Sequence, residues 1–291
     1  MRNKTRFGLA TTIVAAVALS VIASVSAVAQ GPRTAAKAWD PPRTPDGQPD
    51  IQGFWETPAY APDLETGIDD EETSAIQGRR AVDKSKEVSV VIDPPDGKIP
   101  YQPWAQTRRL AIPSFRRGEN RGSALSLRDI RPRTFCLHGT PRSTLQDFQV
   151  TQTPGYVVMA WEFNHTYRSI PLDGRPHLAP NVKLVMGDAR GRWEGNTLVV
   201  DTTNLNDWDW FDYTGTFHSD AVSLVERFTF VDANTIQYQF TVTDPKVFTR
   251  PWTVAVPLER IQRPADYELM EHACVEGERG VEALLGDKKA R

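Results

Sequence analysis

The chain has 291 residues, of which 40% are hydrophobic and 24% are charged, and its formal net charge is -3 at pH 7. This acidic balance argues against a nucleic-acid or anionic-membrane partner, because both require a net basic face. A chain of this length can form one sizeable domain with an elaborated N-terminal region.

The N-terminus has the features of a secretory signal peptide. Arg2, Lys4 and Arg6 precede an apolar, Ala/Val-rich run, and small residues at Ala27 and Ala29 supply a cleavage site. A membrane anchor is the alternative, since the run is long enough to span a bilayer. The Pro/Gly-rich sequence that follows favours cleavage. We therefore expect residues 1–29 to be removed, and the mature protein to be periplasmic or secreted with no stable membrane insertion.

Residues 30–130 are predicted to form a collar around a β domain. Residues 30–50 are rich in proline and glycine and predict an extended lead-in. Ile51–Trp55 predicts a short edge strand. Residues 60–130 predict irregular segments with two helical pieces, Thr73–Lys86 and Pro103–Leu110. Because this region has few apolar residues for a core of its own, it should wrap the β domain and not fold separately.

From Phe148 onward, apolar residues recur at every second position between turn residues, which is typical of antiparallel strands with one buried face. Strands are predicted at Tyr156–Phe163, Tyr167–Leu172, Lys183–Met186, Thr197–Thr203, Val222–Phe230, Thr235–Thr243, Arg250–Leu258 and Tyr267–Val275. Such a series indicates an up-and-down barrel or a two-layer sandwich. Full closure removes sheet edges and favours the barrel. We predict a barrel domain over residues 131–276 and a charged tail over 277–291.

The two cysteines, Cys136 and Cys274, lie at opposite edges of the β-rich region. Export to an oxidising compartment favours a disulfide between them over two buried free thiols. Closing so long a loop stabilises a protein by about 4–5 kcal/mol in the chain-entropy model.

Two residues are the leading candidates for proton transfer. Glu226 lies on the apolar phase of its predicted strand, where burial can make a carboxylate a general acid or base. A structural ion pair, for example with an arginine, is an equal alternative. His218 follows an aromatic loop at Asp207–Asp220 that is typical of a pocket mouth. Its alternative role is a hydrogen-bonding strut. Contiguous His218, Ser219 and Asp220 do not make a catalytic triad, whose members converge from separate segments.

Further candidates come from neighbouring strands and turns. His165, Asp188 and Asp201 are reserve candidates for catalysis, although His165 can be structural and Asp188 can cap a turn. Arg168 could hold an anionic substrate group. The expected substrate-binding residues are Trp161, Tyr167, Arg168, Trp210, Tyr213, Tyr238 and Trp252.

No motif in the chain indicates a cofactor or a metal. Phosphate-binding and dinucleotide-binding glycine patterns are absent, and the histidines form neither H-x-H nor H-E-x-x-H. Histidines of separate strands can still converge, so a His-ligated metalloenzyme stays a weaker alternative. The full histidine set is His138, His165, His177, His218 and His272.

Seven segments of the chain carry a family resemblance. They are P-D-I-Q-G-F-W at 49–55, D-G-K-I-P-Y at 96–101, P-R-T-F-C-L-H-G-T-P-R at 132–142, D-G-R-P-H at 173–177, M-G-D-A-R-G-R-W-E-G-N-T-L-V-V-D-T-T at 186–203, H-S-D-A-V-S-L-V-E-R-F at 218–228 and D-P-K-V-F-T-R-P-W at 244–252. On these motifs the chain resembles a family of uncharacterised exported bacterial proteins. The W-x-G-x-T-L-V-V hairpin and the meander also look like calycin (lipocalin-like) barrels.

The calycin resemblance implies two function classes. One is a cofactor-independent lyase, hydratase or isomerase that acts by general acid/base chemistry on a small hydrophobic or aromatic molecule. The other is a non-catalytic binding protein for the same kind of ligand. Two ionisable groups close together across a cavity would favour the enzyme, whereas a cavity lined only by apolar and neutral groups would favour the carrier.

Overall fold

The computed structural model describes residues 39–57, 64–65, 89–112, 127–130, 132–139, 141, 146–212, 214–264, 266–270 and 272. All of them belong to one compact unit, residues 39–291, and residues 1–38 form the other unit. The predicted signal peptide, the helix predicted at Thr73–Lys86, Cys274 and the charged tail lie outside the described residues.

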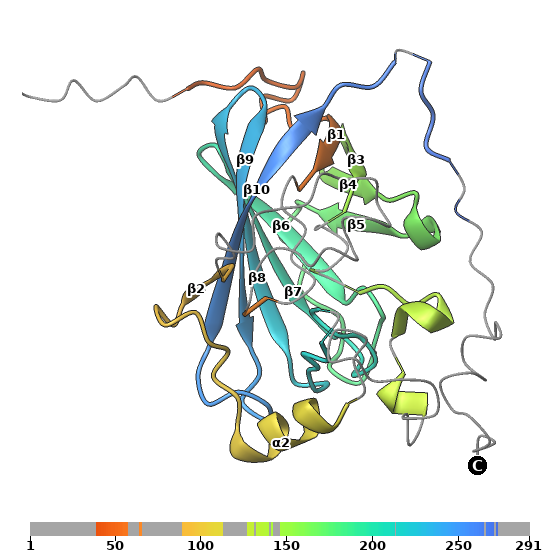
Figure 1. Ribbon diagram of the computed structural model, residues 1–291. Helices are drawn as coiled ribbons and strands as arrows, with labels where there is room; N and C mark the ends of the chain where they lie inside the picture. Colours follow the sequence, from red (N-terminus) through yellow and green to blue (C-terminus); the bar gives the residue numbers. More distant parts are fainter. Residues whose placement is uncertain are drawn as a thin grey trace, which may run out of the picture. The chain divides into compact units, whose positions relative to one another are not determined.

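A ten-stranded antiparallel sheet dominates the described residues (Figure 1). Its strands are β1 (Gly53–Glu56), β2 (Val91–Asp93), β3 (Phe148–Thr153), β4 (Tyr156–Ala160), β5 (Tyr167–Pro171), β6 (Asp188–Glu194), β7 (Thr197–Thr203), β8 (Ser223–Asp232), β9 (Thr235–Thr243) and β10 (Trp252–Ile261). Neighbours follow the order β5-β4-β3-β1-β10-β9-β8-β7-β6, and β2 pairs with β10. The predicted mainly antiparallel β class is confirmed.

In the long strands, the residues that are apolar at every second position of the sequence are also the residues that are buried. In β8, Leu224, Glu226 and Phe228 are buried, and in β9 and β10 buried residues again alternate with more exposed ones. Successive side chains of a strand point to opposite faces, so alternation of this kind means that one face meets the core. The strands predicted at Thr197–Thr203 and Thr235–Thr243 agree with β7 and β9 at both ends.

The sheet is not closed into a barrel, so the predicted calycin barrel is not confirmed. Strands β5 and β6 are its two ends, and the described residues show no hydrogen-bonded ladder between them. The two strands nevertheless approach each other through side chains. A Cβ on Gly191 of β6 would lie 2.8 Å from Cγ2 of Ile170 in β5. Only glycine leaves room for β5 at this position.

Three predicted strands differ from those observed. β1 is not at an edge, because it pairs with β10 on one side and β3 on the other. The Lys183–Met186 segment makes only an isolated bridge, Leu184 with Leu205, and Tyr267–Met270 is irregular. β2 pairs with β10 and was not predicted. The 30–130 region therefore adds two strands to the sheet, and does not only wrap it.

Among the described residues, the α-helix is α2 (Pro103–Ala111), and it confirms the helix predicted at Pro103–Leu110. A proline in the first turn suits a helix start, where its missing N–H costs no hydrogen bond. The Gln102 N–H donates to the Val247 carbonyl at 2.8 Å, which fastens this end of α2 to the β9–β10 connection. Short 3-10 helices occur at η3 (Leu127–Asp129), η4 (Pro132–Phe135) and η6 (Phe163–His165). No helix among the described residues is long and apolar enough to cross a membrane.

The disulfide stays a prediction. Cys136 is not a free thiol, but Cys274 lies outside the described residues. We expect the denatured protein to take up no alkylating reagent without reductant and two alkyl groups after reduction. Intact-mass spectrometry checks this result, and two alkyl groups on the unreduced chain would contradict the bond.

Candidate functional site

The aromatic loop between β7 and β8 packs onto the sheet. Trp210, Phe211 and Phe217 are buried. The Phe211 ring lies 5.7 Å from the Trp252 ring and 6.4 Å from the Phe240 ring, measured between centroids. Burying such rings drives loop association through the hydrophobic effect. The loop is therefore a packed layer over β9 and β10.

A buried polar network holds this loop against α2. The Asp212 carboxylate accepts hydrogen bonds from the backbone N–H of Thr214 and of Thr216, at 2.9 and 3.0 Å. The Tyr101 hydroxyl donates to Oγ1 of Thr216 at 2.8 Å, and Arg109 of α2 donates to Oγ1 of Thr214 at 3.0 Å. Burial raises the pKa of Tyr101, so its hydroxyl stays protonated and able to donate. The helix and the loop thus form one rigid support.

Asp244 fixes the end of the loop that carries His218. Its carboxylate accepts the Ser219 N–H at 2.6 Å and the Ser219 hydroxyl at 2.9 Å. The Ser219 hydroxyl proton is therefore directed to Asp244, and Nδ1 of His218 lies 3.1 Å from the Ser219 carbonyl oxygen. A nucleophilic serine needs its proton directed to a histidine nitrogen. This arrangement supports the sequence-based exclusion of a triad.

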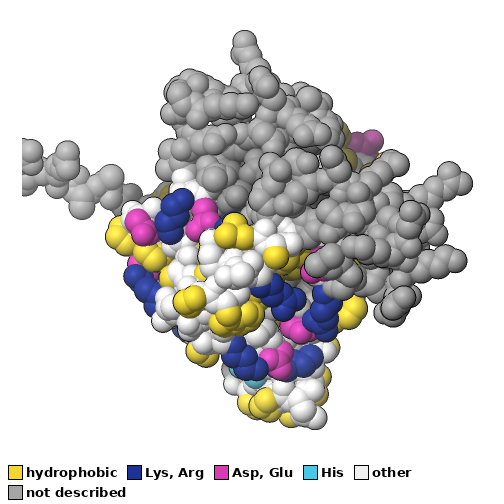
Figure 2. Space-filling model, turned by 60° about the horizontal axis from the view of Figure 1, so that its bottom comes forward, with side chains coloured by type: hydrophobic (Ala, Val, Ile, Leu, Met, Phe, Trp, Pro, Cys, Tyr) yellow, Lys and Arg dark blue, Asp and Glu magenta, His cyan; other side chains and the backbone are white. Residues whose placement is uncertain are grey.

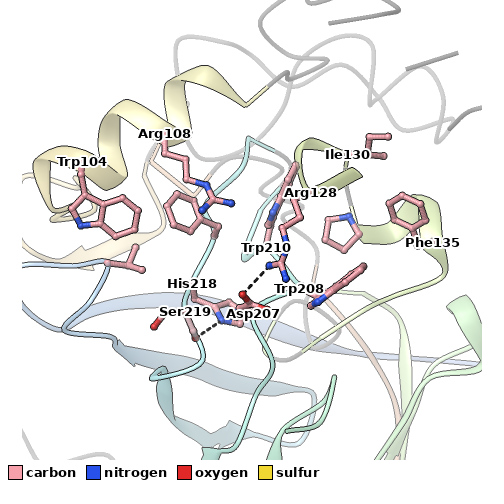
Figure 3. A pocket seen from close by; sticks show the side chains of 13 residues that line it. Trp104, Arg108, Arg128, Ile130, Phe135, Asp207, Trp208, Trp210, His218 and Ser219 are labelled. Carbon is pink, nitrogen blue, oxygen red and sulfur yellow. Dashed lines mark hydrogen bonds and ion pairs between the residues drawn. The ribbon is translucent and has the colours of Figure 1, made fainter. Parts of the chain in front are cut away.

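A cavity of about 100 Å³ lies between this loop, α2 and the segment that carries η3 and η4. Figure 3 shows Trp104 and Arg108 of α2 on one side and Arg128, Ile130 and Phe135 on the other. The lining residues are Trp104, Arg108, Arg128, Ile130, Pro132, Phe135, Asp207, Trp208, Trp210, Phe217, His218, Ser219 and Val247. An apolar cavity of about 150 Å³ holds one benzene-sized molecule. At about 100 Å³ this cavity is smaller than a benzene site, and its lining mixes aromatic side chains with charged ones, so it accommodates a small molecule or part of a ring compound.

His218 is the buried polar group of this cavity. Its side chain is 3% exposed, and its ring lies 5.0 Å from the Phe211 ring. Nε2 has no hydrogen-bond partner among the described residues. Burial lowers the pKa of His218 below its ordinary value, against the raising effects of the Ser219 carbonyl and of the Asp244 and Asp207 charges. His218 is therefore neutral at pH 7, with Nδ1–H donated to Ser219 and a lone pair on Nε2.

This low pKa predicts a pH-dependent stability. In the folded state the pKa of His218 is lower than its ordinary value of 6.5, which applies to the unfolded chain. At a pH between the folded-state pKa and 6.5, the unfolded chain therefore binds more protons than the folded one. The contribution of neutral His218 to the free energy of unfolding is complete above pH 6.5. It is lost as the pH falls from 6.5 through the lower pKa of the folded state. We expect the free energy of unfolding to fall less from pH 7 to pH 5 in His218→Asn than in the wild type. Urea denaturation at each pH measures it, and identical slopes would contradict the assignment.

The cavity rim carries two arginines with different partners. The Arg128 guanidinium pairs with the Asp207 carboxylate at 2.8 Å and lies 5.2 Å from the Trp208 ring centroid. The Arg108 guanidinium lies 4.7 Å from the Phe217 ring centroid and has no carboxylate partner among the described residues. Figure 2 shows hydrophobic, basic and acidic side chains interspersed on the described surface. Among the described residues of the rim, Arg108 is therefore the cation without a carboxylate partner.

Glu226 does not line this cavity, so the structure does not support the predicted His218–Glu226 proton-transfer pair. Glu226 is 0% exposed and forms a two-pronged ion pair with Arg168, one contact of which is 3.0 Å. The Tyr238 hydroxyl donates at 2.8 Å to Oε1 of Glu226, the oxygen that also accepts from Nη1 of Arg168, and Oγ1 of Thr202 accepts from Arg168 at 2.6 Å. Both carboxylate oxygens of Glu226 and both terminal nitrogens of Arg168 have partners here, whereas Nε of Arg168 has none among the described residues. The arrangement matches the alternative of a structural ion pair.

The three reserve candidates lie outside the cavity. Asp188 accepts from the backbone of Leu178 and from Arg190, and it contacts Nδ1 of His177 at 2.9 Å. Burial acts to raise the pKa of Asp188, but these hydrogen bonds hold it below its ordinary value. Asp201 pairs with Arg192 on the outer face. His165 is exposed at the end of η6. Asp188 thus fastens the loop that carries Leu178. None of the three residues is among those that line the cavity.

Of the predicted substrate-binding residues, the structure brings only Trp210 to the cavity. Trp161 and Trp252 are core residues, and Arg168 and Tyr238 belong to the Glu226 cluster. Tyr167 is 69% exposed, and Tyr213 lies outside the described residues. A residue packed in the core and a residue that lines a pocket both lie on the inward face of a strand. The alternation of apolar and polar residues marks that face, so it could not tell the two kinds of residue apart.

Sequence reasoning missed Trp104, Arg108, Arg128 and Asp207. Trp104 and Arg108 are four residues apart in α2, so they share one helix face, and the predicted helix held that signal. Arg128 lies in the short 3-10 helix η3, which no periodicity marked, and Asp207 lies in the aromatic loop that the sequence did mark, although without a role for this residue.

Comparisons with family models, with curated proteins and with solved structures gave no match. The family resemblance therefore stays a prediction. Within the described residues, no group of three or more His, Cys, Asp or Glu side chains is arranged to hold a metal ion.

Proposed function

We propose that this protein is exported and binds a small, largely aromatic molecule in the cavity at His218, where His218 acts as a general base. The single observation that carries the proposal is the buried Nε2 of His218, which has no partner among the described residues. A buried polar atom without a partner costs free energy, about 1–3 kcal/mol. Nε2 itself has less than 1 Å² of accessible surface, so a ligand with an O–H, N–H or acidic C–H group removes that cost when the side chains around Nε2 move aside.

The neutral imidazole supports proton transfer near neutral pH. Nε2 takes a proton from the ligand, and the resulting imidazolium returns it to another ligand atom or to a leaving group. The Asp244–Ser219 contact orients the ring through the Ser219 carbonyl. Chemistry of this kind belongs to isomerases, lyases and hydratases and needs no cofactor.

A non-catalytic binding protein is the second candidate, and one observation favours it. The carboxylate that lines the cavity, Asp207, is already paired with Arg128. His218 then has no unpaired carboxylate in the cavity lining to act as a second proton-transfer group. In a binding protein, Nε2 would only accept a hydrogen bond from the ligand. Turnover of the bound molecule separates the two candidates.

Native mass spectrometry of the protein purified from its exported compartment tests the proposal. We expect a small molecule to accompany the wild-type chain and to be reduced in His218→Asn, which keeps a donor to Ser219 but removes the Nε2 acceptor. Asp220→Asn is a matched control in the same loop, because Asp220 faces Lys246 outside the cavity. Equal ligand loads in the wild type and His218→Asn would contradict the site.

A further inference from the structure

Two of the three walls of the cavity at His218 are joined by buried contacts. Arg109 of α2 donates to Thr214 of the aromatic loop, and both side chains are buried. The Gln102 N–H at the start of α2 donates to the carbonyl of Val247, which lines the cavity. These bonds hold α2 and the loop in place relative to each other, so the third wall is the one that can move independently.

The third wall is the segment that carries η3 and η4, described at residues 127–130 and 132–139. Its C-terminal end is anchored in the interior of the protein. His138 is buried there, and the Gly139 N–H donates to the buried Asp209 carboxylate at 2.6 Å. A Cβ on Gly139 would lie 2.5 Å from Oδ2 of Asp209, so glycine permits this close approach. A hydrogen bond to a buried carboxylate is a strong attachment.

The N-terminal end of the same segment is attached at the surface. Arg128 pairs with Asp207 at 2.8 Å, and the two side chains are 48% and 44% exposed. The Arg128 guanidinium also lies 5.2 Å from the ring centroid of the exposed Trp208. Figure 3 shows Arg128 directed toward Asp207. Water and salt screen exposed ion pairs and exposed cation–π contacts, so this end is held more weakly than the Gly139 end.

The middle of the segment covers the cavity. Ile130, Pro132 and Phe135 all belong to the cavity lining, and Ile130 is buried. Nε2 of His218 is out of reach of solvent in this arrangement. A small molecule can therefore reach Nε2 only after part of the lining has moved.

We propose that the η3–η4 segment is a lid over the cavity, hinged at Gly139 and latched by the Arg128–Asp207 ion pair. When the latch opens, the apolar side chains of the lid swing away from the cavity and a small molecule gains access to Nε2 of His218. This inference rests on the proposed function, because it explains how the His218 site is reached.

Two probes measure the opening of the full chain without an identified ligand. Hydrogen exchange with mass spectrometry reports on the lid backbone, and diethyl pyrocarbonate, which modifies neutral imidazole nitrogens, reports on access to His218. Arg128→Gln removes the charge of the latch. We expect exchange at residues 127–135 and modification of His218 both to become about two- to tenfold faster, because loss of the exposed contacts raises the open population by this factor.

The matched control is Arg263→Gln, which should leave both rates unchanged. Arg263 also pairs with a carboxylate, that of Asp147 at 3.3 Å, and lies 4.8 Å from the ring centroid of Tyr267. It does not line the cavity. The exposed His165 supplies a reference modification rate within each sample, and exchange in β8 and β9 reports whether the sheet stays folded.

Charge reversal and salt separate a latch from a residue that only supports the fold. Arg128→Glu should give the fastest exchange, because it places a second negative charge beside Asp207. Adding Asp207→Arg to this variant restores an ion pair and should return both rates toward the wild type. Salt at about 0.5 M should speed exchange of the wild-type lid but not that of Arg128→Gln, since only the wild type has a pair to screen.

Two outcomes overturn the inference. If Arg128→Gln speeds exchange of the lid no more than Arg263→Gln does, the ion pair is not a latch. If the lid exchanges faster but His218 is modified at the wild-type rate, the segment does not control access to His218. Neither result depends on a bound molecule, so native mass spectrometry of the wild type and His218→Asn decides the proposed function separately.

Discussion

Substitution of His218 by glutamine is expected to lower turnover of the cognate ligand by about 10²–10⁴-fold, the usual contribution of a positioned general base. Glutamine can present an amide near the position of Nε2, so it keeps a hydrogen-bonding group at the cavity. It cannot accept and return a proton at neutral pH. The measurement is kcat and KM for the molecule identified by native mass spectrometry.

The comparison of His218→Gln with His218→Asn separates catalysis from binding. His218→Asn keeps the donor to the Ser219 carbonyl and loses the group at Nε2, so it should weaken binding as well as turnover. His218→Gln should reduce kcat with a smaller change in KM. If His218→Gln retains full turnover, His218 is not the base. If both variants lose stability but bind normally, His218 is a structural strut.

Substitution of Glu226 by methionine is expected to destabilise the fold by about 3–5 kcal/mol, because it leaves the Arg168 guanidinium buried without its counter-charge. Arg168 is 3% exposed and makes both of its charged contacts with Glu226. Arg168→Met should be similarly costly, since it leaves a buried carboxylate. Urea denaturation measures the free energy of unfolding of each variant.

The double variant Arg168→Met with Glu226→Met distinguishes a structural pair from a catalytic carboxylate. Replacing both partners removes the unpaired charge, so the double variant should lose less stability than the two single variants combined. The hydroxyls of Thr202 and Tyr238 lose their partners, and this keeps the double variant below the wild type. Single variants within about 1 kcal/mol of wild-type stability would contradict the structural assignment.

The functional readout of the same variants is equally specific. Glu226 does not line the cavity, so a folded double variant should carry the co-purifying molecule as the wild type does. Loss of binding in a double variant that melts cooperatively would return Glu226 to the candidate site.

Local periodicity alone determined the long strands and the helix. The alternation in β8 and β9 needs no knowledge of neighbours, because a strand presents successive side chains to opposite faces wherever it lies. The α2 helix was likewise marked by a proline at its start. The burial of the aromatic loop followed from its composition, since several large rings cannot all be exposed at little cost.

Pairing across the sheet was decided only by the tertiary structure. Alternation placed Glu226 on the core face, but its partner Arg168 comes from β5, at the far end of the strand order from the β8 hairpin. The contact exists because the ends of the sheet approach each other at Gly191. No local pattern encodes that approach, so the sequence left ion pair and catalytic acid as equal alternatives.

The cavity shows the same division. His218 could be chosen from its loop, because histidine beside aromatic residues is an unusual local composition. Arg108 and Trp104 could not be assigned to it, since α2 precedes His218 by more than a hundred residues. The helix meets the loop through non-local contacts, such as those of Arg108 and Trp104 with Phe217. Convergence of separate segments depends on the path of the whole chain, and the free energy that selects this path comes from non-local packing.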